Sequence, residues 1–107
     1  MMTDIKWYWD DDNFGITAEG HAEHNPGNDI VCSAISALLQ TLWAGLEMHC
    51  FTSVEHSQNS GSFTLTGSVY GYRERVVALF DSILYGLELI AEKYPENVKI
   101  ERVKVGG

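Results

Sequence analysis

Residues 20–36 read GHAEHNPGNDIVCSAIS. This stretch holds a histidine, His21, then a short polar loop, and then an apolar run that Asp29 opens and that carries Cys32. A thiol near the start of a helix, with an imidazole eleven residues earlier in the chain, is a candidate Cys-His nucleophile pair. The remaining segments are expected to form the scaffold of this pair.

Two short segments upstream alternate apolar and polar side chains, which is typical of strands with one buried face. They are residues 4–10 (DIKWYWD) and 14–20 (FGITAEG), with a polar turn at 11–13 between them. The apolar positions are Ile5, Trp7, Trp9, Phe14, Ile16 and Ala18. The pattern predicts a β-hairpin, and His21 then lies where its second strand ends.

Two helices are predicted, from Ile30 to about Met48 and from about Tyr72 to Tyr94, because apolar residues recur there with helical spacing. Residues 22–28 show no periodicity and are expected to form a loop. Asp29 is then the predicted N-cap, since its carboxylate can accept hydrogen bonds from the free amides of the first turn. A glycine late in each helix, Gly45 or Gly86, is interpreted as allowing close approach of a neighbouring backbone.

The segments that follow the first helix and the second helix predict three more strands. Residues 49–56 and 62–69 flank a turn at 57–61 and predict a second hairpin, and residues 97–105 predict a last strand. The element order is ββαββαβ. We expect an α+β fold with a mostly antiparallel five-stranded sheet and two helices, in a single domain over residues 1–107.

Composition excludes several classes of function. The formal net charge of −8 argues against direct nucleic-acid binding, which needs clustered Lys and Arg. The chain has no run of eighteen or more apolar residues, so no membrane span is predicted, and the N-terminus has no secretory pattern. A cytoplasmic protein with free thiols at Cys32 and Cys50 is expected.

Cys32 has two interpretations. Free cysteine is often a small buried core residue. With Asp29 as cap, however, Cys32 would be the third helical residue, where free amides and the helix dipole favour a thiolate and can hold an oxyanion. Ser36, one turn later, can hydrogen-bond near the thiolate or bond back to the carbonyl four residues earlier.

The histidines also leave alternatives open. His21 can serve as general base only within hydrogen-bond reach of the sulfur, and His24 is a rival three residues later. His49 and His56 fall in the predicted third strand and are interpreted as structural. Asp29 can cap the helix, orient the imidazole, or do both. A zinc site from His21, His24, Cys32 and Cys50 matches no closed zinc pattern, so no metal or cofactor is expected.

Two separated parts of the chain resemble the family of the ribosomal-processing cysteine protease Prp. They are Gly20–Ala22 (GHA) with Gly27–Leu38 (GNDIVCSAISAL), and Gly86-Leu87 with Ile90–Ile100 (IAEKYPENVKI). The resemblance implies that Cys32 and His21 are catalytic and that Asp29 and Ser36 support them. Gly20, Ala22 and Gly27 flank these residues in the motif and are expected to contact substrate.

The resemblance further implies an endopeptidase of the bacterial cytoplasm, without a cofactor. Such enzymes remove a short N-terminal extension, ending in aromatic residues followed by alanine, from a large-subunit ribosomal protein. Members of the family are homodimers, with a mobile loop between the two catalytic residues, here residues 22–28. A phage-encoded relative that processes a viral structural protein, and a non-catalytic dimeric module that binds a peptide, are the alternative readings.

Overall fold

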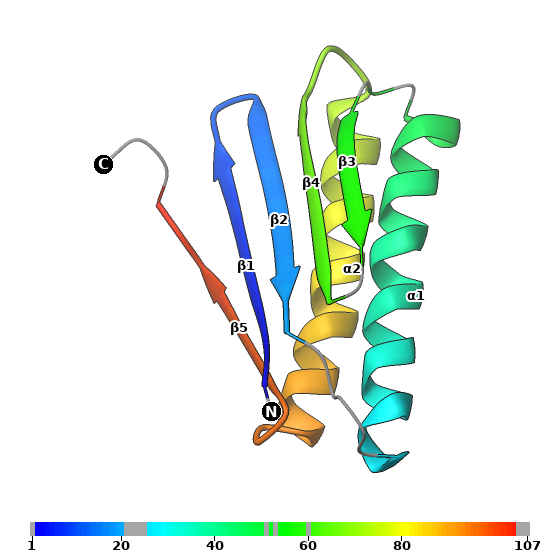
Figure 1. Cartoon of the computed structure of the whole chain (residues 1–107). Helices are drawn as coiled ribbons and strands as arrows, with labels where there is room; N and C mark the ends of the chain where they lie inside the picture. Colours follow the sequence, from blue (N-terminus) through cyan, green and yellow to red (C-terminus); the bar gives the residue numbers. More distant parts are fainter. Residues whose placement is uncertain (1, 21–25, 51, 53, 60, 105–107) are drawn as a thin grey trace.

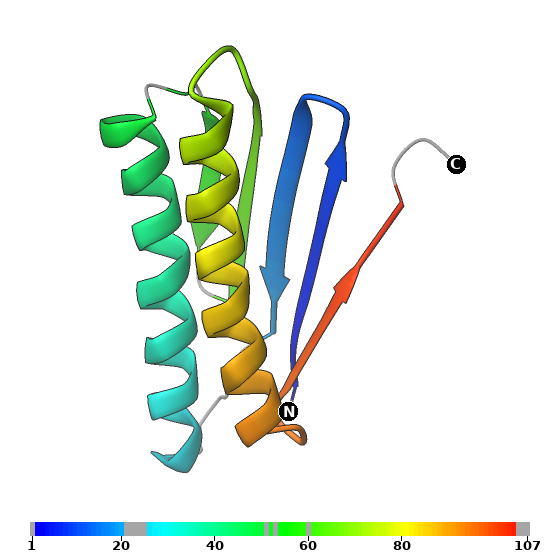
Figure 2. The same ribbon diagram turned by 180° about the vertical axis from the view of Figure 1, so that it is seen from behind.

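The computed structural model describes residues 2–20, 26–50, 52, 54–59 and 61–104, and for residues 26–29 it describes the backbone alone. The fold has two layers, a twisted sheet and a pair of helices that cover one of its faces (Figures 1 and 2). Among these residues, no helix covers the other face of the sheet (Figure 1). This is the predicted ββαββαβ order.

The sheet has five strands in the order β3-β4-β2-β1-β5. Their bounds are β1 Thr3–Asp10, β2 Asn13–Glu19, β3 Val54–Asn59, β4 Ser62–Ser68 and β5 Val98–Arg102. Three neighbouring pairs are antiparallel and only β1 with β5 is parallel, as the prediction of a mostly antiparallel sheet requires. The central pairing of β2 with β4 joins the two hairpins, and it places Ala18 opposite Phe63.

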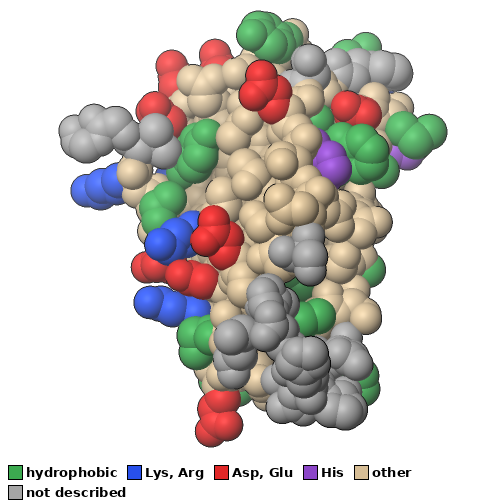
Figure 3. All heavy atoms as spheres, viewed as in Figure 1, with side chains coloured by type: hydrophobic (Ala, Val, Ile, Leu, Met, Phe, Trp, Pro, Cys, Tyr) green, Lys and Arg blue, Asp and Glu red, His purple; other side chains and the backbone are tan. Residues whose placement is uncertain are grey.

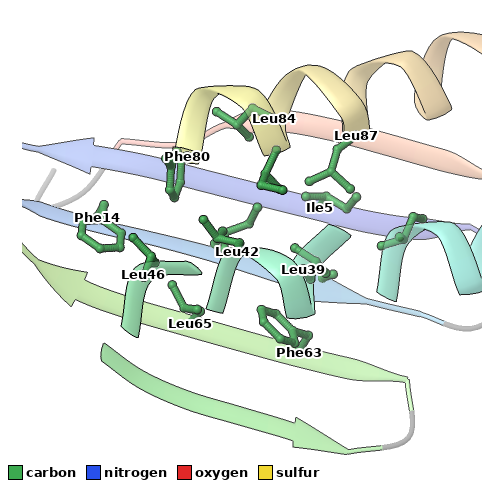
Figure 4. Packing of buried hydrophobic residues seen from close by; sticks show 14 of the residues in the cluster. Ile5, Phe14, Leu39, Leu42, Leu46, Phe63, Leu65, Phe80, Leu84 and Leu87 are labelled. Carbon is green, nitrogen blue, oxygen red and sulfur yellow. The ribbon is translucent and has the colours of Figure 1, made fainter. Parts of the chain in front are cut away.

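The core lies between the sheet and the helices, α1 (Pro26–His49) and α2 (Arg73–Lys93). Its side chains come from both layers and interdigitate (Figure 4). The largest fully buried members are Phe14, Phe80, Ile5, Ile16, Leu39, Leu42, Leu46, Leu65, Leu87 and Val76. Trp9 packs on Phe14 and Phe80 with ring centroids 5.0 and 5.4 Å away, so the predicted inward face of the first strand is confirmed.

The two helices run in opposite directions (Figure 1) and meet through a reciprocal pair of glycines. A Cβ on Gly45 would lie 2.7 Å from Cδ2 of Leu79, and a Cβ on Gly86 would lie 3.0 Å from Cδ1 of Leu38. The interpretation that these glycines admit a neighbouring backbone was wrong. Each of them makes room for a leucine side chain of the other helix.

Helix α1 begins at Pro26, three residues before the predicted cap at Asp29. Proline is favoured in the first turn of a helix because its φ angle is already helical and its missing N–H has no partner to lose. Residues 26–28, expected in the loop, are therefore helical, and Asp29 lies within the first turn. Residues 21–25, the rest of that expected loop, lie outside the described residues.

The second hairpin also begins later than predicted. His49 is the last residue of α1 rather than part of a strand, and β3 starts at Val54 and continues to Asn59. His56 does lie in β3, where its ring stacks on Trp43 at 4.5 Å and lies 5.1 Å from Phe63. That packing agrees with a structural role for His56.

By length and composition, Ile30–His49 is apolar enough to cross a membrane, with a mean hydropathy of 1.4. In the fold, one face of this helix carries core residues such as Ile35, Leu39 and Leu42 against the sheet. The core helix of a folded domain passes the same test of length and composition, although only 28% of this segment is buried here.

The uncovered face of the sheet is largely neutral and polar (Figure 3). Thr17 of β2 pairs with Thr64 of β4, and Gly15 pairs with Thr66. The ring of Tyr8 lies over Gly15, where an added Cβ would collide with it. Charged side chains gather over β1 and β5, at the opposite side of the sheet from β3 (Figure 3).

Candidate active site

A pocket of about 170 Å³ lies between the N-terminal half of α1 and the turn end of the β3–β4 hairpin. Its lining residues come from four strands or their ends and from one helix face. They are Thr3, Ala18, Gly20, Cys32, Ile35, Ser36, Leu39, Gln58, Asn59, Gly61, Ser62 and Phe63. Apolar side chains of the core form one side of this pocket, and short polar side chains form the rest.

Cys32 lies in this pocket and is half-buried, so its thiol is accessible without being a surface group. The interpretation of Cys32 as a fully buried core cysteine is therefore wrong. Its predicted position as the third helical residue is also wrong, because α1 begins at Pro26 and Cys32 lies in the second turn.

The free amides of α1 belong to its first turn, before Cys32. Gly27 and Asn28 carry such amides, about one turn and 6 Å of helix rise before the thiol. An oxyanion held next to Cys32 therefore needs a further donor closer to the sulfur than the amides of the helix start.

Ser36 is a candidate for that donor. It lies one turn after Cys32 and lines the same pocket. Its hydroxyl oxygen accepts a hydrogen bond from Nε2 of Gln40 at 2.9 Å, which leaves the hydroxyl proton available to a ligand. Thr41 and Ser82, by contrast, donate to the carbonyl four residues earlier at 2.7 Å. Thr41 and Ser82 thus bond back to the helix backbone, whereas Ser36 bonds to the side chain of Gln40.

Gly20 directly follows β2, lines the pocket and has a φ angle of 112°. This is a left-handed conformation that glycine adopts without strain. A Cβ at this position would also collide with the carbonyl oxygen of Met2. Its amide donates to the carbonyl of Gly61 at 2.9 Å, which ties the end of β2 to the β3–β4 turn. The backbone directly before His21 is thereby fixed beside Cys32.

Three of the predicted site residues, Cys32, Ser36 and Gly20, come together in one pocket. Gly27 and Asp29 belong to the first turn of α1, where the structure describes backbone only. His21, Ala22 and the rival His24 lie outside the described residues.

Sequence reasoning missed the part of the pocket that comes from β4 and from the end of β3. Phe63, together with Ile35 and Leu39 of α1, supplies an apolar wall, and Gln58 and Asn59 line the rim. From the sequence, Phe63 belongs only to the predicted strand 62–69. The register that places Ala18 opposite Phe63 would have located it, but register between distant strands is not encoded locally.

The second thiol, Cys50, belongs to a different part of the molecule. It follows the C-terminal end of α1, roughly 25 Å of helix rise from Cys32, and only 3% of it is exposed. Burial raises the pKa of the Cys50 thiol, and the charge of Arg75 opposes that rise. Both cysteines are free thiols.

Within the described ranges, no three His, Cys, Asp or Glu side chains are grouped so as to hold a metal ion. The described groups of this pocket that can take part in chemistry are its thiol, its hydroxyl group and its apolar wall.

Several solved structures share this fold. Two are crystal structures of the essential ribosomal processing protease Prp from S. aureus, one with a covalently linked product peptide and one with a substrate peptide. They have TM-scores of 0.79 and 0.80, 23% and 22% sequence identity, and cover 95% of this chain and 100% of their own. SMU.848 from Streptococcus mutans has a TM-score of 0.75 and 26% identity over 96% of this chain and 98% of its own.

A comparison with curated proteins gave no match. The model of the cysteine protease Prp family matches residues 2–99, which is nearly the whole chain. This match contains the first part of the motif, the second part up to Lys99, the pocket, and strands β1 to β4 with the start of β5. The chain therefore belongs to the cysteine protease Prp family.

Proposed function

We propose that this protein is a cysteine endopeptidase that removes a short N-terminal extension from a large-subunit ribosomal protein. The observation that carries the proposal is the half-buried thiol of Cys32 in a pocket with Ser36 and Gly20, in a chain of the Prp family. The S. aureus structures with bound peptides support a peptide as the substrate.

The proposed chemistry uses His21 as base and then as acid. His21 accepts the proton of the Cys32 thiol, and the thiolate attacks the scissile carbonyl carbon to form a tetrahedral intermediate. The C–N bond then breaks, and the leaving amine takes the proton from His21. Water, deprotonated by the same imidazole, hydrolyses the resulting thioester and restores the free thiol.

The negative charge on the carbonyl oxygen needs donors at the pocket. The Ser36 hydroxyl proton is one candidate, since its oxygen already accepts from Gln40 and its proton is free to point elsewhere. The amides of the first turn, including that of Gly27, are the other candidates, over a longer reach. Asp29 is proposed to orient the imidazole of His21.

The pocket is proposed to hold an aromatic side chain that precedes the cleaved bond. Its apolar wall of Phe63, Ile35 and Leu39 suits a ring, and a ring gains both from burial and from edge contacts with Phe63. The net charge of −8 should also favour a basic segment after the cut, and salt should weaken that preference.

The protein is further proposed to act in the cytoplasm as a homodimer, without direct contact to nucleic acid or to a membrane. Several large apolar side chains are exposed on the outer face of the helix layer, which supports a partner there. The three tryptophans are half-buried in the domain by contacts with Phe14, Phe80 or His56.

The test is cleavage of a peptide library by the wild type and by Cys32→Ala. We expect cleavage after aromatic residues that precede alanine, and none with Cys32→Ala. Cleavage without an aromatic preference would contradict the ribosomal substrate and favour a viral structural protein. Binding without cleavage by the wild type would favour a peptide-binding module, and cleavage by Cys32→Ala would rule out the mechanism.

A further inference from the structure

Strand β3 forms one edge of the sheet, with β4 on one side and no strand on the other among the described residues. Natural sheets protect such edges with lysine, proline or bulges that hinder pairing with another chain. β3 reads VEHSQN, with Glu55 as its single charged residue and no proline. The opposite edge, β5, reads VKIER and carries three charges. The two edges thus differ, and β3 is the one open to a further strand.

The direction of the β3 backbone groups follows from two hydrogen bonds between β2 and β4. The amide of Gly20 donates to Gly61 at 2.9 Å, and the amide of Val69 donates to Asp12 at 2.8 Å. In an antiparallel pair, the residues that bond to one neighbour alternate with those that bond to the other side. The odd-numbered residues of β4 therefore bond to β2, and its even-numbered residues bond to β3.

The register of β3 with β4 completes this assignment. Asn59, Ser57 and Glu55 stand opposite even-numbered residues of β4 and bond to them. The alternate residues, His56 and Gln58, consequently direct their N–H and C=O groups away from the sheet. Their side chains lie on the face that α1 covers, since His56 pairs with Leu65 and Gln58 pairs with Phe63.

This free edge leads to the thiol. Gln58 and Asn59, at the end of β3, line the pocket that contains Cys32. Farther along the strand, Trp43 of α1 stacks on His56. One side of α1 carries, in order along the helix, Cys32, Ser36, Gln40 and Trp43. This side of the helix and the edge of β3 therefore lie on either side of the approach to the sulfur.

We propose that the substrate segment next to the cleaved bond pairs with the free edge of β3 as a sixth strand. The inference rests on the proposed function, because its occupant is the peptide to be cleaved. The outward groups of His56 and Gln58 hold the peptide backbone, as in other cases of strand addition. Pairing fixes the chain in an extended form and delivers one bond to Cys32.

The same geometry assigns a specificity role to Trp43. Side chains of an added strand alternate between the two faces of the sheet. A residue opposite His56 points toward α1 and meets the half-buried ring of Trp43. Trp43 is thus a second contact for an aromatic substrate residue, separate from the pocket at Phe63.

The test uses the best-cleaved peptide of the library described above, with its backbone amides N-methylated one at a time. Methylation removes a donor and blocks close pairing. We expect a period of two along the peptide, with kcat/KM falling roughly 3- to 10-fold at alternate positions, as loss of one hydrogen bond implies. The positions between should change less than about 2-fold on the same scale.

A second arm changes the protein. Gln58→Pro removes an outward N–H but no bond to β4, and proline is tolerated at such edge positions. Relative to Gln58→Ala, which loses the same side chain, Gln58→Pro should lose a further 3- to 10-fold in kcat/KM at an unchanged melting temperature. Hydrogen exchange on Cys32→Ala should show slower exchange of the His56 and Gln58 amides when the unmethylated peptide is added.

Cleavage without the alternation, or equal kcat/KM for the two Gln58 variants, would overturn the pairing and leave the proposed function standing. If these two amides exchange slowly even without peptide, and more slowly at higher protein concentration, the edge pairs with a second copy of the chain instead. If no peptide of the library is cleaved, the proposed function fails and the pairing fails with it.

Discussion

At the scale of single residues, the two thiols of this chain have opposite environments. Cys32 is half-buried in an open pocket, whereas Cys50 is 3% exposed and its thiol pKa is raised by burial. Iodoacetamide reacts with thiolates that it can reach. In the native protein it should therefore modify Cys32 and spare Cys50, as peptide mass mapping can show. Labelling of Cys50 at the rate of Cys32, or labelling of native Cys32→Ala, would contradict this assignment.

The buried thiol also predicts how stability depends on alkaline pH. The pKa of Cys50 is higher in the folded state than in the unfolded chain, so the folded state holds its proton more tightly. This contribution to the free energy of unfolding is complete below the unfolded pKa of about 8.5 and is lost as pH rises above it. Urea unfolding at pH 7 and 10 should show a larger alkaline loss for the wild type than for Cys50→Ala. Equal losses would show that Cys50 does not titrate differently on folding.

The choice between the two histidines of residues 21–25 rests on their chain positions. His21 directly follows Gly20, whose backbone is tied to Gly61 beside Cys32. His24 lies three residues farther along. His21→Ala should therefore lower kcat at least 100-fold, the usual range for loss of a general base. His24→Ala should retain most of the activity. Loss from His24→Ala alone would show that His24 is the base.

How much of the site the sequence predicts can be argued from particular residues. Cys32, Ser36 and Gly20 belong to one short motif, and the structure brings them into one pocket. Phe63 and Gln58 could not be assigned to it, because their approach depends on the pairing of β2 with β4 across more than forty residues. The placement of Cys32 in the second turn of the helix was also missed.

At the scale of elements, apolar patterns predicted the order of the strands and helices and the inward face of the first hairpin, and the ends of the elements were less accurate. Asp29 is a good cap, but Pro26 is an equally good first helical residue, and the helix begins there. Residues 57–59 read as a turn because Ser, Gln and Asn are polar. Pairing with β4 nevertheless keeps them in β3. Strand pairing outweighed local preference at residues 57–59, whereas at the helix start one local preference outweighed another.

The glycine pair between the helices predicts two different outcomes for the same substitution. Alanine gains about 1 kcal/mol of helix propensity at either site. At Gly86 the new Cβ would lie 3.0 Å from a terminal carbon of Leu38, whereas at Gly45 it would lie 2.7 Å from Leu79. Gly45→Ala should consequently be less stable than Gly86→Ala by roughly 1 kcal/mol, since overpacking offsets the gain. Urea unfolding of both variants measures this, and equal stability would show that Leu79 moves aside freely.

At the scale of the whole molecule, the outer face of the helix layer is the part that lacks an explanation within one chain. Ile30 and Met48 of α1 are 69% and 71% exposed and lie five full turns apart, on the same side of the helix. Tyr85 and Leu89 of α2 are 68% and 66% exposed and one turn apart. This side of both helices faces away from the sheet (Figure 2). These four exposed side chains lie on one face of the helix layer, and the proposed dimer contact is placed there on that ground.

The proposed homodimer can be tested on that face. Light scattering at micromolar concentration should give twice the 12.0 kDa mass of one chain. Leu89→Glu should shift the mass toward one chain, because it places two like charges across a twofold contact that an acidic protein already disfavours. Tyr70→Glu makes the same charge change at an 86% exposed residue between β4 and α2, so it should remain dimeric. A single-chain mass for the wild type would remove the dimer. Equal loss in both variants would place the contact elsewhere than on the helices.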